Sequence, residues 1–337
     1  MGLRERMKEG KILVAEGYLF EMERRGWMKA GPFVPEVVLD HPEALRELHR
    51  EFAHCGSDVV LAFTYYAHRD KLKIVGREDD LESLNRKALR LAREVADEYG
   101  CLMAGNICNT WVYDPSDPKS WGAVREMYRE QVAWAKEEGA DYIVAETLFY
   151  LGEARIALEV IRSFGLPAVV TLAPFHKESY DGYPWPMACR ILELDGADVV
   201  GLNCGMGPAT MLPLLRDIRA AVSGPLAALP VPYRTTPDHP TFQKLTFKGV
   251  QAFPVRLEPF LLVRDEVATF AREALDLGVD YLGLCCGGAP HYIRSMAEAV
   301  GRSPPASRYS PDMSRHAMLG DGATVRRHNA VYRYSWE

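Results

Sequence analysis

The chain has 337 residues, of which 48% are hydrophobic, so it can form either one large α/β domain or two average ones. Its net charge of -6, without a long basic stretch, argues against a nucleic-acid-binding surface and favours a small-molecule partner. No apolar run approaches the roughly 20 residues that span a bilayer, so no membrane association is expected. The polar N-terminus and seven dispersed cysteines, an odd number, favour a cytoplasmic protein without a disulfide framework.

Short apolar runs alternate with amphipathic stretches along the chain. The first run ends in Glu16 and Gly17, and it predicts a strand with a carboxylate at its C-terminal end. Later runs end in Tyr65 and Tyr66, or in Glu146 and Thr147. We predict strands at 12–16, 59–64, 101–106, 140–147, 166–174, 199–204, 225–231 and 281–286. We predict helices at 19–25, 41–55, 79–100, 121–139, 151–164, 186–194, 208–222 and 264–277.

Four of the predicted strands follow the same Gly-x-Asp phrase, in which glycine ends a helix through a left-handed turn. These phrases begin at Gly56, Gly139, Gly196 and Gly278. Eight strands, most of them followed by a helix, predict a (β/α)8 TIM barrel rather than two domains. Functional groups in this fold lie at the C-terminal ends of the strands. A doubly wound sheet is less well supported, because no glycine-rich phosphate-binding fingerprint follows the first strand.

Two of these strands end in cysteine and glycine: 199–204 ends in Cys204, and 281–286 ends in Cys285 and Cys286. Three sulfurs delivered to strand ends suit a soft or borderline divalent metal, and Zn2+ with one position left open for chemistry is the usual case. We therefore predict a catalytic zinc held by these cysteines. The alternatives are ordinary core packing of thiols and a strained disulfide between Cys285 and Cys286.

The character of the sequence changes after residue 302. Ser303-Pro-Pro breaks the last helix, and the segment that follows has little periodicity and many charges. We predict a barrel at 1–302 and an extended tail at 303–337, which lies on the barrel or reaches a neighbouring subunit of a homo-oligomer.

Several segments together resemble the betaine-homocysteine S-methyltransferases, within the wider family of zinc-dependent homocysteine methyltransferases. The segments are VAEG, KAGPF, HPEALRELHREF, AFTYYA, GLNCG, LEP and LGLCCGG. The similarity runs from about residue 10 to about residue 305, and parts of the tail at 304–307 and 332–337 also match. The resemblance implies a barrel that moves a methyl group from a small onium donor, glycine betaine or a related betaine, to the sulfur of homocysteine, giving methionine.

The resemblance also implies roles for individual residues. The family zinc ligands correspond to Cys204, Cys285 and Cys286, and Glu146 corresponds to the glutamate that helps hold the amino group of homocysteine. Glu16, followed by Gly17, stands where the family usually has aspartate in a slightly longer glycine turn.

The donor side departs further from the family pattern. Aromatic residues that enclose the trimethylammonium group correspond to Phe33, Tyr65 and Tyr66, with Phe33 in place of the usual tryptophan. Thr147 replaces a tyrosine, so one aromatic wall is expected to be lost. The long C-terminal arm through which relatives pair their subunits is not found in this sequence.

Two other functions fit the same residues. The donor could be a sulfonium compound such as S-methylmethionine or dimethylsulfoniopropionate, because the change at Thr147 is compatible with it. A non-catalytic zinc-binding or redox-sensing protein would also use the three cysteines. A phosphate-handling barrel enzyme is disfavoured, because the chain lacks a glycine-rich loop and a basic cluster.

Overall fold

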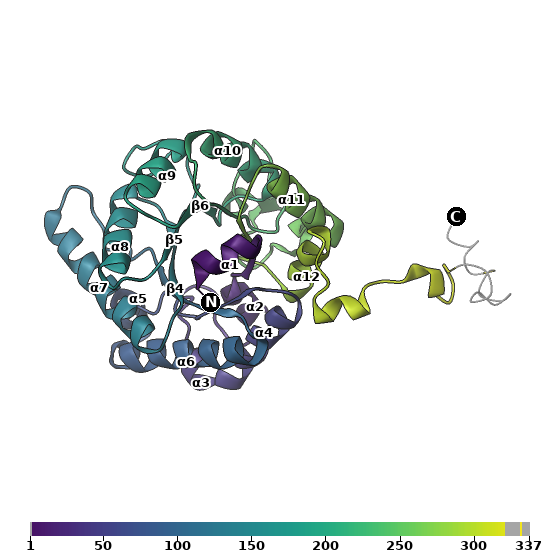
Figure 1. Ribbon diagram of the computed structural model, residues 1–337, viewed down its shortest axis with the longest axis horizontal. Coiled ribbons are helices and arrows are strands. Elements are labelled where there is room, and N and C mark those ends of the chain that lie inside the picture. Colours follow the sequence, from purple (N-terminus) through teal and green to yellow (C-terminus); the bar gives the residue numbers. More distant parts are fainter. Residues whose placement is uncertain (1, 321–330, 332–337) are drawn as a thin grey trace.

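The computed structural model describes residues 2–320 and Val331 of the chain, and it contains a closed barrel of parallel strands surrounded by helices (Figure 1). The strand order is β1-β10-β7-β6-β5-β4-β3-β2, so each strand lies beside its neighbours in the chain and β10 closes the barrel on β1. The predicted (β/α)8 TIM barrel is thereby confirmed. The tail segment 332–337, which entered the resemblance, lies outside the described residues.

All eight predicted strands are present, most of them trimmed at one or both ends. The barrel strands are β1 Ile12–Ala15, β2 Val59–Leu61, β3 Leu102–Cys108, β4 Tyr142–Leu148, β5 Ala168–Leu172, β6 Val199–Asn203, β7 Leu226–Leu229 and β10 Tyr281–Leu284. Every residue of these strands is buried, which explains why they appear in the sequence as continuous apolar runs. The strands β8 Thr246–Phe247 and β9 Val250–Gln251 form a small hairpin in the loop after β7, which the sequence did not predict.

The eight predicted helices are also present, with shifts of up to three residues at their ends. The helices are α1 Leu3–Glu9, α2 Tyr18–Arg24, α3 Val37–Asp40, α4 Pro42–His54, α5 Arg69–Ile74, α6 Leu81–Tyr99, α7 Pro118–Glu137, α8 Leu151–Ser163, α9 Trp185–Leu194, α10 Pro208–Ala221, α11 Arg264–Asp276 and α12 Pro290–Ala299. The short helices α1, α3 and α5 were not predicted, and α12 is the last helix that precedes Ser303-Pro-Pro, for which no range was predicted. Within the described chain, no helix combines the length and the apolar character that crossing a bilayer requires.

The recurring Gly-x-Asp phrase has a second purpose besides ending helices. Its glycines have positive φ, as expected for a left-handed turn. Each aspartate then accepts a hydrogen bond from a backbone N–H at the start of the neighbouring strand. The pairs are Asp58 with Leu13, Asp141 with Met103, Asp198 with Ala168 and Asp280 with Leu226, at 2.7 to 3.1 Å. The phrase therefore fastens strands together in pairs at the N-terminal end of the barrel.

Helix α1 lies across this N-terminal end, in the centre of Figure 1. Leu3 is fully buried, and the side chains of Arg4 and Arg6 bond to two of the fastening aspartates, Asp198 and Asp58. Helix α1 and these bonds cover the N-terminal end of the barrel, so we expect the active site at the opposite end.

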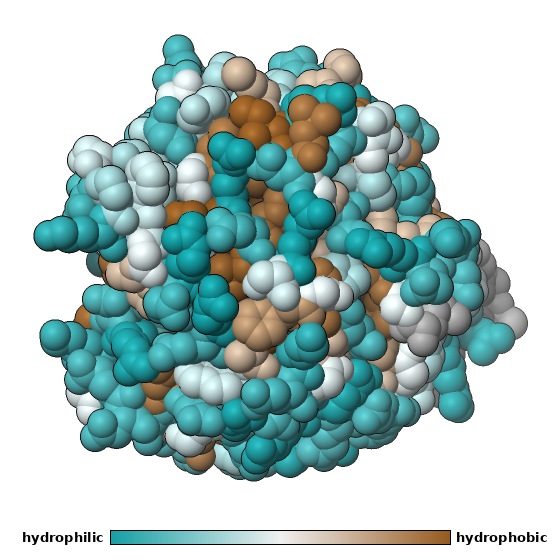
Figure 2. All heavy atoms as spheres, turned by 60° about the vertical axis from the view of Figure 1, so that its left-hand side comes forward, coloured by the Kyte–Doolittle hydropathy of each residue, from teal (hydrophilic) through white to brown (hydrophobic). Residues whose placement is uncertain are grey.

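The outer surface of the barrel is mainly hydrophilic on the side shown in Figure 2. Figure 2 shows the side that carries α7 and α8, where hydrophobic residues gather in a depression bordered by hydrophilic ones. Ion pairs join neighbouring helices on this side, for example Arg86 with Glu138 at 3.1 Å and Arg125 with Glu159 at 3.0 Å. Exposed pairs of this kind contribute little each, about 0 to 1 kcal/mol, so the buried core carries most of the stability.

After α12 the chain first packs against the barrel, where Ala306 is buried and Ser310 bonds Glu298, and then leaves it. Figure 1 shows the segment beyond α12 leading away from the body of the molecule, with short 3-10 turns at Pro305–Tyr309 and Met313–Arg315. The division into a barrel at 1–302 and a tail at 303–337 stays a prediction.

A candidate metal centre between two cavities

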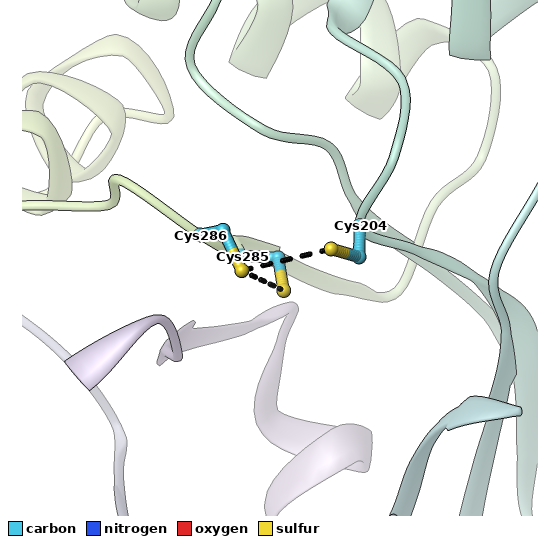
Figure 3. Close-up of side chains that lie close together, drawn as sticks. All are labelled: Cys204, Cys285 and Cys286. Atoms are coloured by element: carbon cyan, nitrogen blue, oxygen red, sulfur yellow. Dashed lines mark hydrogen bonds between the residues drawn. The ribbon is translucent and has the colours of Figure 1, made fainter. Parts of the chain in front are cut away.

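Three thiols meet at the C-terminal end of the barrel, as Figure 3 shows. Cys204 follows β6, and Cys285 and Cys286 follow β10, with their sulfurs turned toward one another. The Sγ atom of Cys286 lies 3.6 Å from that of Cys204 and 3.9 Å from that of Cys285. All three sulfurs lie within 4.8 Å of one another. The two strands therefore bring together cysteines that are 82 residues apart in the chain.

The sulfur spacing fits a metal-binding thiolate set. Sulfurs at about 2.3 Å from a tetrahedral zinc are about 3.8 Å apart, close to the spacing found here. A disulfide would need about 2.05 Å, so the contact between Cys285 and Cys286 is not a vicinal disulfide. The thiols share hydrogen bonds, which lowers the pKa of Cys204 to about 5 and raises those of Cys285 and Cys286. A single thiolate thus forms readily, and a cation would be needed to hold all three sulfurs ionised.

Two buried carboxyl groups lie beside the thiols. A carboxylate oxygen of Glu16, one of Glu146 and the Sγ atom of Cys285 all lie within 4.8 Å of one another. Burial raises the pKa of Glu16, and it raises that of Glu146 to about 8. Neither oxygen of Glu16 has a hydrogen-bonding partner among the described residues. A buried acid without a partner is costly, so this position favours a bound group that carries N–H donors or positive charge.

Two asparagines hold Glu146 in place. Asn106 donates to its Oε1 atom at 2.7 Å, and Asn203 donates to its Oε2 atom at 3.0 Å. The same Nδ2 of Asn203 lies 3.7 Å from the Sγ atom of Cys285 and 2.8 Å from Oγ1 of Thr147. Asn203 therefore joins the carboxylate to the thiol cluster, a connection that the sequence analysis did not predict.

Gly17 is required by a close approach between strand ends. Its φ of 82° is left-handed, and a Cβ atom there would lie 2.3 Å from the carbonyl oxygen of Cys285. Only glycine lets the turn after β1 pass this closely under the cysteine pair.

Two cavities meet at this cluster. The smaller, of about 20 Å3, is lined by Glu146, Asn106 and Cys285, among others. The larger, of about 460 Å3, has Cys204 in its lining and is otherwise mainly aromatic. Leu19, Tyr65 and Cys286 line both. The thiols therefore stand between a small space that contains a carboxyl group and a larger, mainly aromatic one.

The larger cavity is bordered by many more aromatic rings than the sequence suggested. Phe33, Tyr65 and Tyr66, to which the resemblance assigned the donor site, all line this cavity, and Thr147 also reaches it. The rings that the sequence analysis missed are Phe20, Trp111, Phe149, Phe175, Tyr180, Phe242 and Phe253. Phe149 is central to one group, with its ring centroid 5.2 Å from those of Trp111 and Phe175. Aromatic residues of the loops after β3, β4 and β5 therefore line the cavity that Thr147 also borders. The available signal was an aromatic residue soon after β3, β4 and β5.

Backbone strain is concentrated around the same cavity. Among the described residues, six other than glycine have positive φ. Five of them line the larger cavity: Phe33, Tyr66, Trp111, Thr147 and Cys204. Such conformations cost about 1 to 3 kcal/mol each and persist where the surrounding structure fixes them, often at functional sites. Their clustering marks this end of the barrel as the functional one.

The fold and this site together define a barrel enzyme with a candidate thiolate metal centre between a small cavity that contains Glu146 and a larger aromatic cavity. The sequence model of the homocysteine S-methyltransferase family matches residues 17–300. Betaine–homocysteine S-methyltransferase 1 of Mus musculus is 34% identical over 332 residues, covering 95% of this chain and 79% of the relative. An S-methylmethionine–homocysteine S-methyltransferase of the same organism is 33% identical, covering 96% of this chain and 87% of the relative.

Solved structures agree on the fold. The metallated form of the homocysteine methyltransferase MmuM from Escherichia coli superposes with a TM-score of 0.70 at 20% identity, covering 88% of this chain and 99% of that one. The chain belongs to the homocysteine S-methyltransferase family, and it is an S-methyltransferase whose acceptor is homocysteine.

Proposed function

We propose that the protein binds zinc through Cys204, Cys285 and Cys286 and transfers a methyl group from a small onium donor to homocysteine, giving methionine. The observation that supports this most is the junction of two chemically different cavities at the three thiols. The smaller cavity offers the buried carboxyl group of Glu146, with Glu16 beside it, and the larger one offers aromatic faces. A substrate with a thiol and an ammonium group suits the first, and a methylated cation suits the second.

The acceptor side needs a thiolate, because a free thiol near pKa 8.5 is mostly protonated at neutral pH. When bound, zinc would supply the positive charge that stabilises the sulfur of homocysteine as a thiolate. Glu146, held by Asn106 and Asn203, and Glu16 would receive the ammonium group. Fixing both ends of homocysteine orients its sulfur toward the aromatic cavity.

The donor side needs a cation site without a competing nucleophile. Aromatic faces provide such a site at about 0.5 to 2 kcal/mol per ring. Tyr65 and Tyr66 pack together with ring centroids 4.3 Å apart, and Tyr65 borders both cavities. The sulfur then forms a bond to the methyl carbon while the carbon–nitrogen bond breaks, and its electron pair leaves with the nitrogen as a neutral tertiary amine. Alignment of the three atoms is the main requirement.

A sulfonium donor is the second candidate. Thr147 occupies the position where an aromatic residue was expected, and the chain is nearly as similar to a relative named for S-methylmethionine as to one named for betaine. The leaving group would then be a neutral thioether. The acceptor and the thiol centre are the same in both cases.

The experiment is a donor screen combined with metal analysis. The purified protein, loaded with zinc, is given homocysteine with glycine betaine, dimethylsulfoniopropionate or S-methylmethionine in turn, and methionine is measured. We expect about one zinc per chain and turnover with at least one donor. Zinc binding without methyl transfer from any onium compound would instead favour a metal-binding or redox-sensing protein.

The cysteine roles are tested by Cys285→Ala. We expect this variant to lose most bound zinc and all measurable methyl transfer while its circular dichroism spectrum stays that of a folded barrel. Cys189→Ala is the matched control, since Cys189 is a buried thiol on α9 outside the cluster. Full activity in Cys285→Ala would remove this residue from the site.

A further inference from the structure

The larger cavity has an uneven distribution of charge. Its inner end holds Cys204 and Cys286, and its walls are mostly aromatic. The exposed side chains of Lys244 and His176 also line it, together with Gln243. Asp and Glu are absent from the lining residues in the described part of the chain. A bound molecule would therefore meet thiols at one end and a lysine at the other.

Lys244 is held at this outer end by its neighbours in the chain. It ends the 3-10 turn Phe242–Lys244, in which Phe242 is buried and stacks on Tyr233 with ring centroids 5.6 Å apart. Leu245, the next residue, is also buried. The backbone on both sides is thus anchored while the lysine side chain faces solvent at the cavity. Arg234, which precedes it on the same long loop, is already paired with Glu266, whereas Lys244 forms none of the described ion pairs.

Gln243 adds a second polar group. Its Oε1 atom is buried and has no hydrogen-bonding partner among the described residues. Because the oxygen and nitrogen of an amide exchange places by a half-turn of the side chain, this group can present either an acceptor or a donor to the cavity. A buried amide oxygen without a partner indicates that a polar part of a ligand belongs here.

We propose that Lys244 and the amide of Gln243 bind the carboxylate of the methyl donor, so that Lys244 selects onium donors that carry a carboxylate over those that do not. The proposal rests on the proposed function, since it concerns the donor of that same reaction. The positive methyl-bearing end of the donor is attracted to the aromatic faces and to the thiolate of bound homocysteine. The carboxylate is attracted to Lys244. A donor with this charge separation is thereby oriented with its methyl group toward the acceptor sulfur.

The charge pattern also disfavours a donor with an additional ammonium group. S-methylmethionine carries both an α-carboxylate and an α-ammonium, and the lining offers no carboxylate to receive the latter. In the competing arrangement, the oxygen of Gln243 accepts a hydrogen bond from that ammonium. The experiment below distinguishes this arrangement from binding of the carboxylate by Lys244.

The test compares donors that differ in the carboxylate and share the reacting group. Dimethylsulfoniopropionate is paired with trimethylsulfonium ion, and glycine betaine is paired with tetramethylammonium ion. The ratio of kcat/KM within each pair is measured for the native protein, for Lys244→Met and for Lys248→Met. Lys248 is an exposed lysine in the nearby β8–β9 hairpin that does not line the cavity, so it controls for the loss of a positive surface charge.

We expect Lys244→Met to lower kcat/KM for the carboxylate-bearing donors by about two- to fivefold, the usual range for an exposed ion pair, and to leave the others unchanged. The preference should also shrink in high salt, which screens such a pair. Lys244→Glu should reverse the preference within each pair, so that the donor without a carboxylate has the higher kcat/KM. The kcat/KM for S-methylmethionine should also rise relative to that for dimethylsulfoniopropionate.

Two failures can be told apart. If the native protein transfers methyl groups from none of these donors, the proposed function fails, and this proposal fails with it. If the native protein is active but Lys244→Met changes both members of each pair equally, or changes neither, only the role of Lys244 is overturned. The native protein could instead prefer S-methylmethionine, with the same preference in Lys244→Glu. That result would show that the outer end of the cavity binds the ammonium group of the donor.

Discussion

At the scale of single residues, Asn203 is the side chain that connects the two halves of the acceptor site. Its amide nitrogen contacts Glu146 and the sulfur of Cys285, and its amide oxygen accepts from the backbone N–H of Thr147 at 2.8 Å. A hydrogen bond to a charged group contributes about 1.5 to 3 kcal/mol when it is buried. Asn203 therefore affects substrate binding through the groups it positions.

We predict that Asn203→Ala raises the KM for homocysteine by about tenfold or more, because Glu146 loses one of its two amide donors. The KM for the donor should change less. Steady-state kinetics with each substrate varied in turn measure the two effects. Asn109→Ala is the control, since Asn109 is a buried asparagine that donates to the carbonyl of Thr147 and not to Glu146. Equal changes in both KM values would show that Asn203 only supports the fold.

The residues of the site differed in how visible they were in the sequence. Glu16, Cys204 and Cys285 directly follow strands, and Glu146 lies near the end of β4, where a change from apolar to reactive residues is easy to recognise. Trp111 and Phe175 lie in loops beyond β3 and β5, and nothing local distinguishes an aromatic residue that lines a cavity from one that packs in the core. Their role depends on contacts between loops that are far apart in the chain.

At the scale of elements, the strand and helix periods were sufficient to place the barrel, while the short elements escaped prediction. Helices α3 and α5 have four and six residues, too few to show a period. The β8–β9 hairpin has two residues in each strand and is mostly exposed, so it lacks an apolar pattern. The loop that carries Lys244 was therefore the part of the site least accessible to sequence analysis.

The turn between β1 and α2 yields a prediction about backbone approach. Gly17→Ala should destabilise the protein and lower its zinc content, because the new Cβ would lie 2.3 Å from the carbonyl oxygen of Cys285. Gly76→Ala is the matched control: Gly76 also has positive φ, but a Cβ there meets nothing within 4 Å. The free energy of unfolding of the control should fall by only about 1 to 2 kcal/mol, the cost of placing alanine in a left-handed conformation. Urea unfolding and elemental analysis measure both effects, and equal zinc content in the two variants would contradict the prediction.

Helix α4 carries a buried histidine whose protonation opposes folding. His49 packs edge-on against Tyr18 at 4.9 Å, its ring nitrogens have no partner among the described residues, and burial lowers its pKa to about 3. The unfolded chain binds this proton near pH 6.5, so the neutral imidazole's contribution to stability is complete above pH 6.5 and is lost as the pH falls toward 3.

We therefore predict that His49→Phe flattens the fall in the free energy of unfolding between pH 6.5 and pH 4, by up to about 1.4 kcal/mol per pH unit. Phenylalanine keeps the ring contact with Tyr18 and cannot be protonated. Urea titrations across this pH range measure the slope. His239→Phe, a change at an exposed histidine, controls for the loss of an imidazole elsewhere. An unchanged slope in His49→Phe would assign the acid sensitivity to other groups.

At the scale of the whole molecule, the barrel separates stability from chemistry. The aspartates that fasten the strands, the bonds to α1 and the contacts of Arg302 with Asp58 and Lys11 all lie at one end. The thiols, the buried carboxyl groups and the strained residues lie at the other. Substitutions at the active end can therefore be expected to change activity more than the fold, provided that they avoid glycines such as Gly17.

The tail provides the last prediction. Beyond Ser310, which still bonds Glu298, the chain runs away from the barrel (Figure 1). Large apolar side chains are exposed on this part of the chain at Tyr309, Met313 and Leu319. Apolar groups on a projecting segment favour burial against another surface, and a second copy of the chain supplies one. The native protein should therefore have a solution mass above the 37.8 kDa of one chain. Replacing all three residues with serine should shift light scattering toward that value while methyl transfer persists, because the described site lies within the barrel. A native protein that already has the mass of one chain would place the tail outside any subunit contact.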